Sequence, residues 1–150
     1  MESLFFVLLG GWLLITNLLM DSSAPPSDWN PRASYNKISN YGNGKMGITA
    51  DALESLRSHL SFTQLRFHCR KQRVGRTFHV TTAAISSGEA AVQYFTGEKD
   101  EQPKACGSFV RMEDDNSQLP SMCNKWTAMV SGVVTATQDR MRRCLTRVHQ

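Results

Sequence analysis

Two short runs of alternating apolar and polar residues constrain the fold of this chain more than any other feature. Residues 65–70 read Leu-Arg-Phe-His-Cys-Arg and residues 77–82 read Thr-Phe-His-Val-Thr-Thr. Such alternation places apolar side chains on one face of a β-strand and polar side chains on the other. A basic turn at 71–75 joins the runs, so the sequence predicts an antiparallel hairpin. The inward side chains of this hairpin are Leu65, Phe67, Cys69, Phe78 and Val80.

A helix is predicted over Thr49–Leu60, because Leu53, Leu56 and Leu60 recur at helical spacing. Thr49 is placed to cap its first turn. Two further strands are predicted at 90–96 and 108–112. We therefore expect an α+β fold with one N-terminal helix followed by a mostly antiparallel β-sheet, stapled by disulfides.

Four cysteines are available for disulfides, and in an oxidising compartment they allow three connectivities. Cys106 and Cys123 bracket a loop whose closure stabilises a fold by about 3 kcal/mol in the chain-entropy model, so this pair is favoured. Cys69 then has Cys144 as its partner or no partner. No CxxC pair occurs, which argues against a zinc ribbon or a thioredoxin-type site.

The N-terminus carries an almost continuous apolar segment from Leu4 to Met20. Its length and the small residues after it predict a secretory signal peptide over 1–24, and an uncleaved membrane anchor or a buried core helix are the alternatives. Residues 25–47 are rich in Ser, Pro, Asn and Gly, and are predicted to form a linker. A domain over 48–126 and a basic tail over 127–150 complete the expected organisation.

Basic residues gather on the polar face and the turn of the predicted hairpin. Such a cluster attracts polyanions, including sulfated glycans, acidic matrix components and mineral surfaces. The alternative is an ordinary solvated strand face, and secretion argues against nucleic acid as a partner. The candidate polyanion-binding residues are Arg66, His68, Arg70, Lys71, Arg73 and Arg76.

Acidic residues gather in a different turn, at 113–116. Oxygen donors in a turn are the ligands that calcium prefers, although this spacing does not match an EF-hand loop. Three interpretations of this turn remain open: specific calcium binding, a weak contact with mineral, or a plain polar turn. The candidate metal ligands are Glu113, Asp114, Asp115 and Asn116.

An enzymatic role is weighed for His68 and His79, which with Lys71 are reminiscent of two-histidine cleavage of a phosphodiester. No nucleophile or oxyanion-hole motif accompanies them, and Cys69 is predicted to face inward. Zinc bound by the two histidines and a cysteine lacks the ligand spacing of known sites. The sequence therefore predicts no enzyme and no cofactor other than calcium.

Six segments between about Leu53 and Trp126 carry a resemblance to a known family: Leu65–Cys69, Gly75–His79, Val92–Phe95, Ala105–Phe109, Asp114–Ser117 and Cys123–Trp126. In their order and spacing they resemble a secreted cysteine-containing domain found in the skeletal organic matrix proteins of stony corals. The resemblance implies a secreted protein of the extracellular matrix or calcified skeleton, from a group with no known enzymatic activity. Residues 127–150 depart from the family pattern, because its Gly- and Trp-rich segments are missing here.

Together these features predict a secreted, non-enzymatic extracellular matrix or biomineral-associated protein that binds polyanions or calcium mineral. The alternative is a cell-surface protein that keeps its N-terminal segment as a membrane anchor. A membrane is an expected partner only in that second case.

Overall fold

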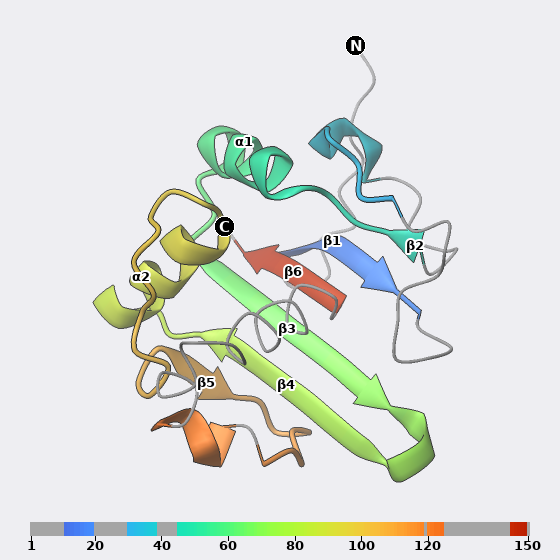
Figure 1. The fold of residues 1–150 in the computed structure, drawn as a ribbon, viewed down its shortest axis with the longest axis vertical. Coiled ribbons are helices and arrows are strands. Elements are labelled where there is room, and N and C mark those ends of the chain that lie inside the picture. Colours follow the sequence, from blue (N-terminus) through green and yellow to red (C-terminus); the bar gives the residue numbers. More distant parts are fainter. Residues whose placement is uncertain (1–10, 20–29, 39–44, 119, 125–144, 150) are drawn as a thin grey trace.

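The computed structural model describes residues 11–19, 30–38, 45–118, 120–124 and 145–149. These residues form two helices and a six-stranded sheet whose neighbouring strands are all antiparallel (Figure 1). The α+β class and the antiparallel sheet are therefore confirmed. Along the sheet the strands follow the order β2-β1-β6-β3-β4-β5. Their bounds are β1 Trp12–Leu18, β2 Lys45–Met46, β3 Gln64–Lys71, β4 Arg76–Thr82, β5 Phe109–Arg111 and β6 Leu145–His149.

The predicted hairpin is confirmed as β3 and β4. Its register pairs Phe67 with Val80 and His68 with His79, so the apolar residues of both strands share one face. A short 3-10 helix at Gln72–Val74 forms the turn. Gly75 closes it with a φ of 59°, a left-handed conformation that glycine adopts without steric strain.

The predicted helix is confirmed as α1 (Ala50–Leu60), and the hydroxyl of Thr49 caps it by accepting from the amide of Ala52 at 3.2 Å. Leu56 is buried, while Leu53 and Leu60 pack partly buried against the core. The leucine stripe therefore faces inward, as its spacing predicts.

The strand predicted at 90–96 is wrong, because Ser86–Phe95 forms a second helix, α2. Ala91, Val92 and Phe95 are all buried, at positions that share one helical face. Gly88 lies where a Cβ would stand 1.7 Å from the carbonyl oxygen of Ala83, so this helix begins against the backbone that follows β4. The expectation of a single helix ahead of the sheet therefore does not hold, since α2 lies between β4 and β5 in the chain.

The hydrophobic core lies between the helices and the apolar face of the hairpin. Phe67 contacts Phe95 of α2 with ring centroids 5.0 Å apart, and Val80 is fully buried. The guanidinium of Arg57 on α1 bonds to the carboxylates of Glu89 and Glu98, which ties the first helix to the second and its following loop. One face of β3 and β4 is thus covered, and the polar side chains occupy the other.

Segments from both ends of the chain complete the sheet. Within the segment predicted as a signal peptide, Trp12–Leu18 forms β1, and its Ile15 is only 1% exposed. The predicted linker supplies Ile38 and Met46 to the core. β6, from the predicted tail, pairs with β1 on one side and β3 on the other. The predicted cleavage region at 22–24 lies outside the described residues, and none of the described helices is long and apolar enough to span a membrane.

The favoured disulfide is confirmed. Cys106 and Cys123 are bonded, with their Cα atoms 5.0 Å apart. Cys69 is also disulfide-bonded. Its expected partner, Cys144, lies outside the described residues.

Candidate functional site

The polar face of the hairpin carries a group of side chains that we call the His–Asp cluster: Arg66, His68, His79 and Asp114. His68 of β3 and His79 of β4 are paired in register, and their rings stack with centroids 4.2 Å apart. Asp114 reaches them from the turn that follows β5. The cluster therefore joins three segments that are separate in the sequence.

Both ring nitrogens of His79 have protein partners. Its Nε2 lies 2.7 Å from Nε of Arg66, and its Nδ1 lies 2.5 Å from Oδ1 of Asp114. An arginine can only donate, so Nε2 accepts, and the ring proton sits on Nδ1 and is donated to Asp114. The sequence places His79 outward, and it does lie on the polar face. It is nevertheless only 5% exposed, because the turn carrying Asp114 packs over it.

Asp114 bridges the two histidines from the solvent side. Its side chain is 57% exposed, and its Oδ2 lies 3.7 Å from Nε2 of His68. The hydrogen bond from His79 lowers the pKa of Asp114 below its usual value and outweighs the opposing effect of burial. Asp114 is therefore held as a carboxylate next to the two rings.

Arg66 closes the cluster on its other side. Its guanidinium lies over the ring of Trp12 in β1, 5.4 Å from the ring centroid, a cation–π contact. This contact and the bond to His79 direct the charge of Arg66 toward the protein.

The remaining predicted calcium ligands serve the structure of the turn. The carboxylate of Asp115 is fully buried, where it accepts from the amide and hydroxyl of Ser117 at 2.7 and 2.9 Å and from the amide of His79 at 3.1 Å. Asn116 accepts from the amide of Thr77 at 2.6 Å. Glu113 is exposed. Among the described residues, Glu113, Asp114 and Asp115 do not bring their carboxylates together as one group of metal ligands, and calcium binding stays a prediction.

The end of the hairpin differs from the His–Asp cluster because the described neighbouring strands do not pair with it and its basic side chains are exposed. β6 pairs with β3 only up to His68, and β5 pairs with β4 only from Val80 onward. Among the described strands, residues 69–78 therefore pair only with each other, although Asn116 bonds to the backbone of Gly75 and Thr77. Figure 1 shows this end extending past the neighbouring strands. Its four exposed cations, which we call the basic tip, form no ion pair with any described residue. They are Arg70, Lys71, Arg73 and Arg76.

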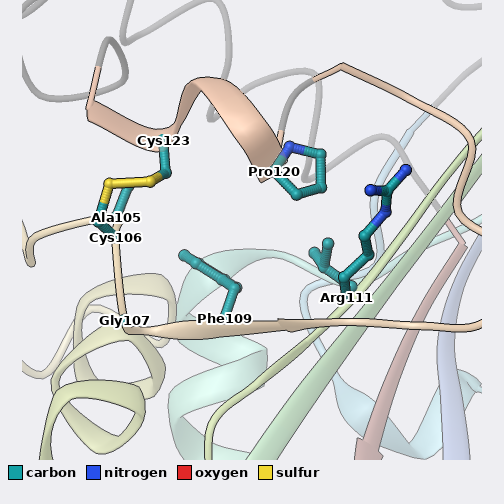
Figure 2. A pocket seen from close by; sticks show the side chains of 8 residues that line it. Ala105, Cys106, Gly107, Phe109, Arg111, Pro120 and Cys123 are labelled. Atoms are coloured by element: carbon teal, nitrogen blue, oxygen red, sulfur yellow. A yellow bond between two sulfur atoms is a disulfide. The ribbon is translucent and has the colours of Figure 1, made fainter.

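A small pocket lies beside the confirmed disulfide (Figure 2). Its volume of about 50 Å³ is enclosed by Phe109 and Arg111 of β5, by Pro120 and by the bonded Cys106 and Cys123. A cavity of this size holds a few water molecules, whereas sites for organic ligands are several times larger. This pocket is therefore too small for an organic ligand.

No protein-family model, curated protein or solved structure matches this chain. Alternation alone places both histidines on one face. The contact between His79 and Asp114, separated by 35 residues, depends on the folded turn and had no local signal in the sequence.

Proposed function

We propose that this protein is a secreted, non-enzymatic protein of the extracellular matrix or a mineralised skeleton that binds polyanions through its basic tip. Secretion is supported by the disulfides, which persist in oxidising compartments. The resemblance of residues 53–126 to skeletal matrix proteins points the same way.

The observation that carries the proposal is a pair of like charges facing each other across the hairpin. Lys71 and Arg76 are direct partners in the strand register. Like charges at such positions destabilise a sheet, and a bound anion would relieve the repulsion. Arg70 and Arg73 flank Lys71 and the turn in the chain, so four cations gather at one projecting end without acidic partners among the described residues.

The structure divides the six residues predicted for polyanion binding into two groups. Arg66 and His68 belong to the His–Asp cluster, where other side chains contact their polar groups. The remaining four cations form the basic tip. Arginine forks bond two oxygens of a sulfate or carboxylate at once, so the three arginines of the tip suit sulfated or carboxylated polymers.

Heparin affinity chromatography tests this proposal. The variant Arg70→Ser/Arg73→Ser/Arg76→Ser should elute at much lower salt than the wild type. The matched control is Arg32→Ser/Lys99→Ser/Lys104→Ser, which removes three exposed cations elsewhere. Equal losses of retention in both variants would mean that net charge alone drives binding, and the proposal would then fail.

Secretion is tested separately, and the alternative is a cell-surface protein anchored by its N-terminal segment. Cleavage near residue 24 would remove β1, including the buried Ile15 and the ring over Arg66. The intact mass of protein recovered from the medium of expressing cells distinguishes the forms. Cleavage of the signal peptide predicts a mass lacking about the first 24 residues, and the mature protein would then keep His68, His79 and Asp114 but lose the Trp12 ring next to Arg66. Recovery only with the cell membrane would favour the anchored alternative.

A further inference from the structure

We propose that His68, His79 and Asp114 form a binding site for a divalent first-row transition metal ion such as Zn²⁺. One ligand atom from each residue lies within 4.8 Å of the other two. This site is distinct from the basic tip, and it shares only Asp114 with the four residues considered for calcium. It goes beyond the proposed polyanion binding and does not depend on it.

The chemistry of the donors selects the class of metal. Two imidazole nitrogens and one carboxylate oxygen suit zinc, copper or nickel, whereas calcium prefers oxygen ligands alone. In a tetrahedral zinc site with bonds near 2.1 Å, two ligand atoms lie about 3.4 Å apart. Nε2 of His68 and Oδ2 of Asp114 are already 3.7 Å apart, so a small movement brings them to that separation.

The scaffold holds two of the three ligands on paired strands. His68 and His79 face each other in register above the apolar core of the hairpin. The turn that carries Asp114 is fixed to β4 by its next two residues, because Asp115 accepts from the amide of His79 and Asn116 from that of Thr77. Ligands fixed in this way lose little conformational freedom when a metal binds.

The metal can reach the site from solvent. Asp114 is 57% exposed and the side chain of His68 is 29% exposed, whereas His79 lies beneath them. Three protein ligands leave a fourth position of a tetrahedral ion for water. The deepest ligand is thus covered by the two that are accessible.

Arg66 competes with the metal for His79. A metal on Nδ1 takes the place of the ring proton, which moves to Nε2, so Nε2 no longer accepts from Nε of Arg66. The positive charge of the guanidinium also repels the incoming cation. Replacing Arg66 should therefore strengthen metal binding, a result that adventitious binding to surface histidines would not produce.

Isothermal titration calorimetry with ZnCl₂ on the full chain, with its disulfides intact, tests the proposal. We expect one ion per chain, and at least tenfold weaker binding in His68→Ala and in Asp114→Asn. Asp114→Asn keeps an oxygen to accept from His79, so it removes the carboxylate while retaining the fold. Arg66→Met should bind Zn²⁺ more tightly than the wild type.

His59 provides the matched control, because it is exposed on α1 and stacks against Tyr35 away from the cluster. His59→Ala should bind Zn²⁺ like the wild type. Wild-type affinity in both His68→Ala and Asp114→Asn would overturn the site. Unchanged or weaker binding in Arg66→Met would overturn the assignment of His79 Nδ1 as a ligand. Heparin retention is measured in parallel, so a failure of polyanion binding is seen independently.

Discussion

The middle and the end of the β3–β4 hairpin both carry basic residues, but these are contacted by other side chains in the middle and exposed to solvent at the end. Arg66 lies in the middle, where His79 accepts its hydrogen bond and Trp12 covers its guanidinium. Arg70, four residues further along the same face, is exposed at the basic tip. The difference lies in the neighbouring segments. β1, β6 and Asp114 reach the middle of the hairpin, whereas at its end Asn116 bonds to the backbone of Gly75 and Thr77 and the charged side chains stay exposed. A charge becomes structural where other segments pack around it, and stays available to a ligand where they do not.

The largest effect on stability should come from a substitution in the 112–118 turn, which covers the middle of the hairpin. Asp115→Ala leaves several buried N–H and O–H donors without an acceptor, so we expect a loss of about 4 kcal/mol in the free energy of unfolding. Urea denaturation measures this loss. Glu113→Ala, at an exposed position of the same turn, should change stability by less than about 0.5 kcal/mol. Similar losses in the free energy of unfolding for the two variants would contradict the structural role of Asp115.

Removing the central histidine should have the next largest effect. His79→Ala opens a cavity and leaves the Arg66 guanidinium without its acceptor, so we expect a loss of about 3 kcal/mol. His59→Ala, on the exposed face of α1, should change stability by less than about 0.5 kcal/mol. Thermal or urea unfolding of both variants checks this difference, and equal stabilities would show that the cluster does not hold the turn.

A smaller loss is expected when the charge of Arg66 is removed. Arg66→Met keeps much of the side-chain stem but removes the donor to Nε2 of His79 and the cation–π contact with Trp12, so we expect a loss of about 1 kcal/mol in the free energy of unfolding. Arg70→Met should be close to neutral, because Arg70 is exposed beyond the covered part of the sheet. If Arg70→Met lowered the free energy of unfolding more than Arg66→Met, the tip would be more important for stability than the middle, contrary to the comparison above.

The smallest change should be a gain in stability at the tip. Lys71→Glu replaces a like-charged pair across the strands with an opposite-charged pair, which should stabilise the hairpin by about 0.5 kcal/mol. The same change should lower the salt concentration at which the protein elutes from heparin. A loss of stability, or unchanged elution, would contradict the view that the like charges of the basic tip lower stability and serve anion binding.

Local patterns in the sequence predicted much of the fold. The alternation over 65–70 and 77–82 gave the hairpin and its inner face, and the leucine spacing with Thr49 gave α1. These predictions hold because each depends on the period of a single element. The strand expected at 90–96 failed because a short apolar run fits a buried strand as well as one face of a helix. This segment forms the helix α2 because Val92 and Phe95 then pack together against the hairpin.

The sequence by itself determined that basic residues and two histidines would share the polar face of a hairpin, because side chains alternate along any strand. Only the tertiary structure decided which of them stay exposed. That depends on Trp12, on Asp114 and on the limits of strand pairing, which are brought to the hairpin from distant parts of the chain. The environment of a charge is set by what packs around it, and no local pattern in the sequence specifies those neighbours.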